Sequence, residues 1–299
     1  MERISTSLIH RSGLESIQRA QQVIDELQNK LGSGKRLLTP SEDPQASSQL
    51  LSLRSELARN ETYQRNLDFA ERMLIERENA VAASIDVLFR ARELLIQGNT
   101  ASMDSGSRQA IVAEVTQLKE QLVALANTKA SDGTYLFAGQ AVTTQPFSSG
   151  GAFLDAGSEM SVNIAPGMTM SVRQSGEAIF EEVDGIDNVF SVLDNIAAAL
   201  NTAPNEQTGT ELSTQLGKLD LGIDALNVER SSVGTKLRRV DDQRLINDAF
   251  NLNVQRTISK LEDLDYAKAI SDLNLHMVSL QAAQQAYVKT QNLSIFNYL

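Results

Sequence analysis

The sequence predicts a mainly α-helical protein, in which the N- and C-terminal halves form a long antiparallel helical bundle or coiled-coil rod. A small β domain is expected to be inserted at the middle of the chain. Heptad spacing of apolar residues at both chain ends and in residues 212–261 supports the helices. Glycine and proline gather in residues 133–185 instead. Aromatic residues are only 5% of the 299 residues and tryptophan is absent, which favours helix-on-helix packing by aliphatic side chains.

The last stretch of the chain carries the organising pattern. Steps of four and three from Asp263 onward predict a terminal helix with one seam, at Tyr266, Ile270, Leu273, Met277, Leu280, Gln284, Tyr287 and Gln291. The other end of the chain repeats this spacing at Ile17, Ala20, Ile24, Leu27 and Leu31. A helix with one apolar stripe needs a partner. We therefore expect residues 1–38 and 265–299 to pair as terminal helices.

Residues that favour helix ends and helix caps divide the first half of the chain. Gly32-Ser33-Gly34 predicts the end of the first helix, because glycine allows left-handed backbone geometry. Asp43 is expected to cap a second helix whose first residue is Pro44. That helix should run to about Gln97, with Arg77 and Ser84 as polar interruptions of its apolar seam. A third helix is expected from about residue 107 to about residue 130.

The middle of the chain has a different amino-acid composition. Eight of the 17 glycines lie between residues 133 and 185, and we expect short strands at residues 135–137, 161–164 and 169–173. Residues 133–185 would form a small outer β domain. Residues 39–132 with 186–264 would form a long-helix rod domain. Its polar seam positions 230, 244, 247 and 251 are predicted to specify the pairing register.

Composition excludes several classes of function. The net charge of −11, with no basic face, argues against a nucleic-acid partner. No cysteine is present, so disulfides and thiol chemistry are excluded. No run of 18 apolar residues occurs, so membrane insertion is not expected. The N-terminus lacks the features of a cleavable signal peptide, and export would need another route.

No constellation for catalysis, a cofactor or a metal is found. Gly32-Ser33-Gly34-Lys35 lacks the outer residues of a phosphate-binding loop and is interpreted as a helix cap. His10 and His276 have no ligand set at metal spacing and are expected on helix surfaces. Asn60-Glu61-Thr62 matches the short glycosylation pattern, which arises often by chance. The sequence therefore predicts a protein that is not an enzyme.

Several segments resemble the bacterial flagellin superfamily. At the N-terminal end they are residues 3–6 (Arg-Ile-Ser-Thr), 31–36 (Leu-Gly-Ser-Gly-Lys-Arg) and 39–46 (Thr-Pro-Ser-Glu-Asp-Pro-Gln-Ala). At the C-terminal end they are residues 264–270 and 280–287. Residues 135–139 (Tyr-Leu-Phe-Ala-Gly), 145–147 (Gln-Pro-Phe) and 293–299 resemble the branch of the superfamily that joins the hook to the filament. The resemblance covers about half of the chain.

This resemblance implies a structural, extracellular part of the flagellum. It implies export by the flagellar type III apparatus without cleavage, an export chaperone on the C-terminal helix, and a ring of copies. The ring would lie between the first hook-associated junction protein and flagellin. By match to the family pattern, assembly and chaperone contacts are expected at Ile17, Ile24, Leu27, Leu31, Ile270, Leu273, Met277, Leu280, Tyr287 and Phe296.

Two alternatives stay open at this point. The chain could be flagellin itself, although its ending Phe296-Asn297-Tyr298 argues against that. It could also be a secreted coiled-coil translocator, which would require an apolar hairpin able to enter a bilayer. The heptads also fit an ordinary bundle within one monomer, especially in the inner helices.

Overall fold

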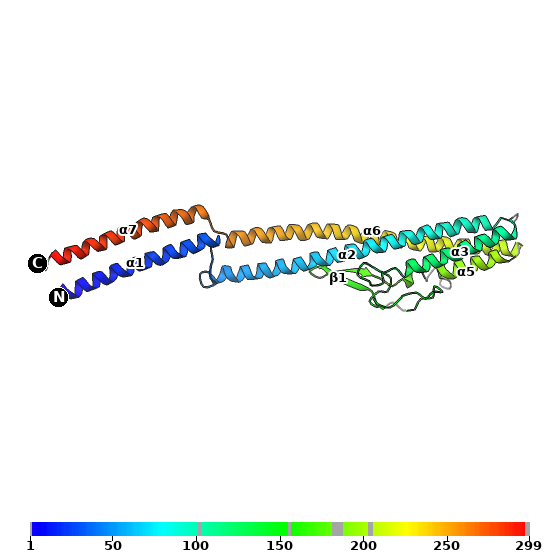
Figure 1. Ribbon diagram of the computed structural model, residues 1–299, viewed down its shortest axis with the longest axis horizontal. Helices are drawn as coiled ribbons and strands as arrows, with labels where there is room; N and C mark the ends of the chain where they lie inside the picture. The colour runs from blue at the N-terminus through cyan, green and yellow to red at the C-terminus, as the bar shows by residue number, and fades with distance from the viewer. Residues whose placement is uncertain (1, 101–102, 155–156, 181–187, 203–205, 297–299) are drawn as a thin grey trace. The chain divides into compact units, whose positions relative to one another are not determined.

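A computed structural model describes residues 2–100, 103–154, 157–180, 188–202 and 206–296, apart from the side chains of residues 2–7, 9, 10, 206, 207 and 290–296. About three-quarters of the chain is helical, which confirms the mainly α class. Figure 1 shows the described elements along the chain: α1 (Glu2–Ser33), α2 (Pro44–Gly98), α3 (Ser105–Ala126), β1 (Met160–Ala165), β2 (Met168–Arg173), α4 (Glu177–Phe180), α5 (Val189–Asn201), α6 (Glu206–Glu262) and α7 (Tyr266–Phe296).

The chain divides into two compact units. Residues 1–59 with 249–299 form one, here called the terminal unit, and residues 60–248 form the central unit. The domain boundaries expected at residues 38, 132 and 264 stay a prediction, and the expected end of the β domain at residue 185 lies outside the described residues.

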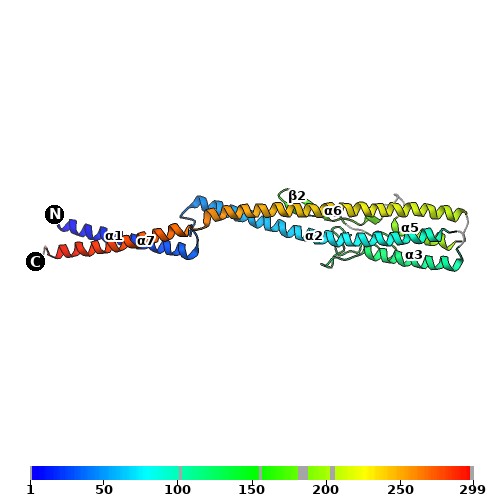
Figure 2. The same ribbon diagram turned by 90° about the horizontal axis from the view of Figure 1, so that it is seen from above.

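In the terminal unit α1 and α7 run side by side in opposite directions, with the start of α1 and the end of α7 at the same end of the pair (Figures 1 and 2). The cap expected after α1 is confirmed, because Gly34 has a φ of 71° and its N–H donates to the carbonyl of Lys30 at 2.9 Å. The cap of α2 is also confirmed. Asp43 accepts a hydrogen bond from the N–H of Ala46 at 3.0 Å, and Pro44 is the first helical residue.

In the central unit α2 and α6 lie antiparallel, and α3 and α5 pack against them (Figure 2). Asp104 caps α3, so this helix begins at Ser105. It ends at Ala126, four residues before the expected end. The physical reason is Asn127, whose side-chain amide donates to the carbonyl of Phe147 and accepts from its N–H, both at 3.0 Å. This pairing draws the chain out of the helix.

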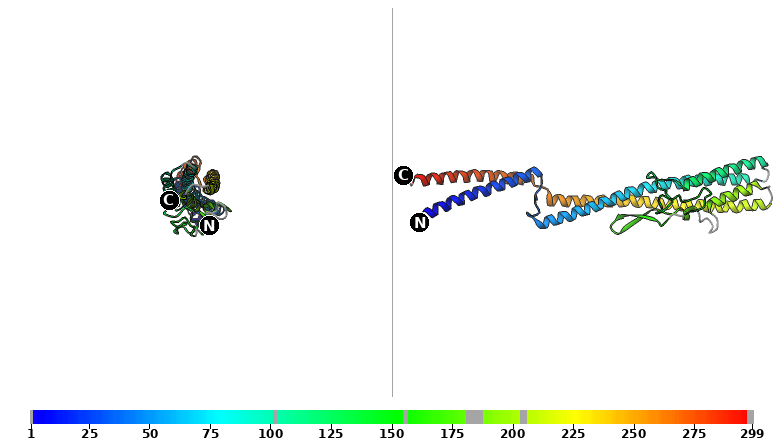
Figure 3. Two further views of the ribbon diagram at one scale, coloured as in Figure 1. Left: turned by 90° about the vertical axis from the view of Figure 1, so that its right-hand side faces the viewer. Right: turned by 60° about the horizontal axis from the view of Figure 1, so that its bottom comes forward.

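Strands β1 and β2 form an antiparallel hairpin around Pro166-Gly167, as expected, with Gly167 at a φ of 70°. The hairpin lies beside α2 and α6 (Figure 3), and its Ile164, Met170 and Val172 pack against apolar residues of both helices. The strand expected at residues 135–137 is wrong. Its N–H groups at 135 and 136 donate to the carbonyls of Val142 and Thr128, so the segment forms turns around a buried Phe137.

Candidate assembly interface

The contact between α1 and α7 is a regular seam. On α1 and just after it, the residues withdrawn from solvent recur with 4-3 spacing at Gly13, Ile17, Ala20, Ile24, Leu27, Leu31 and Gly34. On α7 the same spacing runs through Ala269, Leu273, His276, Leu280, Ala283 and Tyr287. Such matched stripes are the geometry of a two-helix coiled coil. The stripes bring together α1 and α7, which lie in the two segments expected to pair.

Two close contacts define how the helices are aligned. Gly13 packs against the ring of Tyr287, and Gly34 packs against the hydroxyl end of Tyr266. These contacts are 21 residues, or three heptads, apart on both segments. The antiparallel register between them places Ile17 opposite Ala283, Ala20 opposite Leu280, Ile24 opposite His276, Leu27 opposite Leu273 and Leu31 opposite Ala269. In three of these layers an alanine lies opposite a larger residue, which lets the two backbones approach closely.

This seam differs in part from the expected one. Leu273, Leu280 and Tyr287 lie on it, but Ile270 is 49% exposed and Met277 is 43% exposed. Ala269, His276 and Ala283 take the positions expected for Ile270, Met277 and Gln284, because the alanines at 269 and 283 leave room for the large side chains of α1. The side chain of Phe296 lies outside the described residues.

His276 departs from its expected place on the surface, since it is half-buried on the seam opposite Ile24. The four α1 residues expected at the interface, Ile17, Ile24, Leu27 and Leu31, all lie on the α1 stripe. Ile24 is the most withdrawn of them, at 8% exposure.

Because the seam runs through Ala269, His276 and Ala283, a second apolar row on α7 remains exposed to solvent. Ile270, Met277 and Val288 are between 43% and 54% exposed and lie on one side of the seam, and we call them the outer row. Leu275 and Val278, farther round the helix, are exposed as well. A terminal helix with this much uncovered apolar surface is typical of a segment that takes a further partner.

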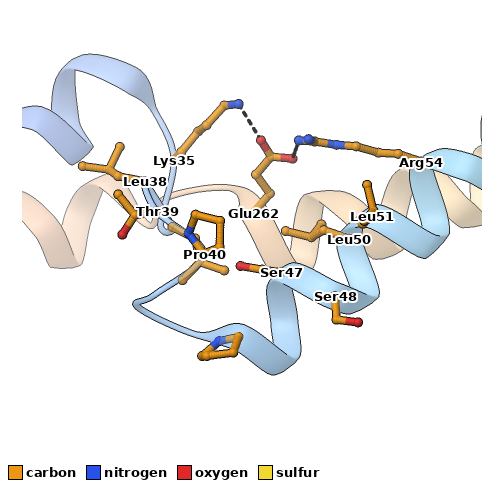
Figure 4. Close-up of a pocket in the computed structure, with 12 residues that line it drawn as sticks. Lys35, Leu38, Thr39, Pro40, Ser47, Ser48, Leu50, Leu51, Arg54 and Glu262 are labelled. Carbon is orange, nitrogen blue, oxygen red and sulfur yellow. Dashed lines mark hydrogen bonds and ion pairs between the residues drawn. The ribbon is translucent and has the colours of Figure 1, made fainter.

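An open groove of about 550 Å³ lies beside the connection between α1 and α2 (Figure 4). Leu38, Pro40, Leu50 and Leu51 contribute its apolar wall. At its edge, the carboxylate of Glu262 lies 2.7 Å from Lys35 and 2.5 Å from Arg54. Hydrogen bonds from these two cations lower the pKa of Glu262. Lys35 is therefore held by a carboxylate, which agrees with the helix-cap interpretation of residues 32–35.

The contacts of the described residues at this interface are packing contacts and ion pairs. Within the described ranges no three histidine, aspartate or glutamate side chains gather at metal-binding distance. The described helices also include none that is long and apolar enough to cross a bilayer. Asn60 is 5% exposed and donates to the carbonyl of Asn247 at 2.8 Å, so the acceptor side chain of the glycosylation-like motif is buried.

Comparison with known proteins matches both ends of the chain to one family. Residues 4–142 match the bacterial flagellin N-terminal helical region, and residues 216–299 match the bacterial flagellin C-terminal helical region. Flagellar hook-associated protein 3 of Escherichia coli (strain K12) is 26% identical over 312 residues, covering 98% of each chain. The protein of that name from Salmonella typhimurium is also 26% identical, over 313 residues and 98% of each chain.

A solved structure supports the fold. The structure of a putative flagellar hook-associated protein from Vibrio parahaemolyticus has a TM-score of 0.68 and 22% sequence identity, covering 74% of this chain and all of that one. The two family matches, which together cover more than half of the chain, show that it belongs to the bacterial flagellin superfamily, a class of structural proteins of the flagellum. Within that superfamily it is a homologue of flagellar hook-associated protein 3, and it is a flagellar component rather than an enzyme.

Proposed function

We propose that the chain is a junction protein that links the hook, through the first hook-associated protein, to the flagellin filament. The uncovered outer row of α7 is the observation that carries this proposal. The α1 stripe already occupies the seam of α7, so Ile270, Met277 and Val288 remain for a neighbouring subunit. Burying such a row stabilises an assembly through the hydrophobic effect and needs no catalytic residue.

The partner of the outer row in the mature structure would be a second copy of this chain, in a ring of copies. Before assembly, the same row would be covered by a flagellar export chaperone. Export would follow the flagellar type III route, and the protein would then be extracellular. The full-length similarity to flagellar hook-associated protein 3 supports these assignments.

A strain that lacks the gene provides the first test. We expect intact hooks without filaments, together with flagellin monomers lost into the medium, because filament subunits would have nothing on which to nucleate. Missing filaments without released flagellin would instead indicate that the chain is the filament subunit. Normal filaments, in a strain with no second copy of the gene, would contradict both functions.

A pair of variants tests the outer row itself. Met277→Glu places a charge in the row, whereas Ser271→Glu adds the same charge at an exposed position about a third of a turn farther round α7. We expect Met277→Glu to abolish filament formation and Ser271→Glu to preserve it. The amount of each variant in the culture medium separates failed export, expected if the chaperone no longer binds, from failed assembly after export.

A further inference from the structure

Two glycines of the terminal unit have tyrosine side chains where their own side chains would be. A Cβ atom at Gly13 would lie 3.0 Å from Cδ2 of Tyr287, and one at Gly34 would lie 2.8 Å from the hydroxyl of Tyr266. Gly32, also in α1, would have no atom within 4 Å of its Cβ. Glycine is unfavourable inside a helix. Its presence at position 13 thus coincides with a need for space.

The heptad pattern alone does not align the two helices. A slip of seven residues, about 10.5 Å along the axis, keeps the same stripes facing each other. In one direction such a slip brings Tyr266 opposite Leu27. In the other direction it brings Tyr287 opposite Ala20 and moves Tyr266 beyond the end of α1. Each slip therefore takes both tyrosines away from glycine.

We propose that the two Gly–Tyr layers, Gly13 with Tyr287 and Gly34 with Tyr266, set the register of α1 against α7. The two glycines are sockets three heptads apart. In the observed register each tyrosine lies opposite a glycine, and after a slip of one heptad neither does. If the outer row of α7 contacts a neighbouring subunit, as in the proposed function, this register also fixes the axial position of the row relative to α1 in every copy.

Engineered cysteines measure the register directly, because the chain has none of its own. In the full-length chain, Leu27→Cys with Leu273→Cys reports the observed register. Leu27→Cys with Leu280→Cys reports a slip of one heptad. The rates of disulfide formation with a mild oxidant, read on non-reducing gels, give a ratio of aligned to slipped pairs. We expect the aligned pair to form at least tenfold faster.

Substituting Gly13 should lower the ratio of aligned to slipped disulfides. Gly13→Leu is expected to reduce it at least threefold, and Gly32→Leu, the same change on the same helix, should leave it unaltered. Combining Gly13→Leu with Tyr287→Ala gives a large-small layer again and should restore the ratio. Gly13→Ala, which adds a single methyl group, serves as the milder variant if Gly13→Leu does not fold.

The inference is overturned if the parent chain forms both disulfides at equal rates, or if Gly13→Leu and Gly32→Leu behave alike. Circular dichroism of both variants separates a change of register from a change of helix content, because leucine replaces glycine within α1 in each of them. The cross-linking result does not depend on the proposed function. A chain that keeps its register but does not support filaments would refute the junction role alone.

Discussion

Arg77 of α2 and Glu229 of α6 form an ion pair of 2.7 Å in which the arginine side chain is only 2% exposed. The carbonyl oxygen of the Gln174 side chain, just after β2, accepts from Arg77 at 3.3 Å and from Lys236 at 3.2 Å. Burial lowers the pKa of Arg77, and the charge of Glu229 opposes that effect. The pair therefore ties the base of the β hairpin to both long helices.

Removing one partner of this ion pair should be costly. We expect Arg77→Met to lower the free energy of unfolding of the central unit by about 3–5 kcal/mol, because the half-buried Glu229 would lose the ion pair with its buried guanidinium partner. The double variant with Glu229→Met should recover part of the loss. Urea unfolding followed by circular dichroism measures both, and Arg90→Met, at an exposed pair, is the control that should change little. A double variant less stable than Arg77→Met would contradict this account.

The hydrogen bonds that lower the pKa of Glu262 predict a pH dependence in the terminal unit. Because the folded pKa lies below the ordinary value of 4.5, the stabilisation is present above that value and is lost as the pH falls through the lowered one. Lys35 and Arg54 are half-exposed, so Glu262→Gln should cost about 1 kcal/mol at pH 7.

Hydrogen exchange of residues 35–54 provides the measurement. Glu262→Gln should speed exchange there at pH 7. After correction for intrinsic rates, the difference from the parent chain should shrink on acidification below pH 4. A difference that grows with acid would show that Glu262 does not stabilise this region as a carboxylate.

Phe147 is the centre of an aromatic cluster in the central unit. Its ring centroid lies between 5.4 and 5.6 Å from those of Phe153, Phe180 and Phe190, and the side chain is fully buried. Phe147→Ala should destabilise the central unit by about 3–5 kcal/mol in urea. Phe89→Ala removes the same ring from a position that is 48% exposed and should cost far less. Equal losses would mean that the cluster is not a core.

Asn60 is predicted to carry no glycan, although its motif fits an acceptor. Its side-chain amide is buried and occupied by the carbonyl of Asn247. Intact-mass measurement of the folded chain, after exposure to an N-glycosylating extract, should show no added sugar on the peptide that contains Asn60. The same peptide, treated after denaturation, is the control that shows whether the motif can be used at all.

Local signals in the sequence were enough to predict most of the helices. Gly34, Asp43 and Pro44 act on their own neighbours through backbone geometry and capping, so the ends of α1 and α2 could be predicted from them. Pro166-Gly167 identified the β hairpin for the same reason. Residues 135–139 and 145–147, which resemble the branch that joins the hook to the filament, contain Phe137 and Phe147, and both rings are fully buried in the structure.

Long-range packing decided the features that sequence reasoning missed. Arg77 looked like an interruption of an apolar seam, because its partner Glu229 lies 152 residues away. The segment at residues 135–137 had strand composition, but the N–H groups of Tyr135 and Leu136 donate to the carbonyls of Val142 and Thr128 instead of to a neighbouring strand.

By itself the sequence determined that the chain is mainly helical, that its two ends pair, and that it belongs with the flagellins, because heptad spacing, caps and turn residues act locally. Only the tertiary structure decided which side of α7 faces α1. Two overlapping 4-3 patterns, through Ile270 and Met277 or through Ala269 and His276, are both available on that helix. The choice depends on the sizes of the residues opposite, where Gly13 and Gly34 accept tyrosine rings and leave the outer row exposed.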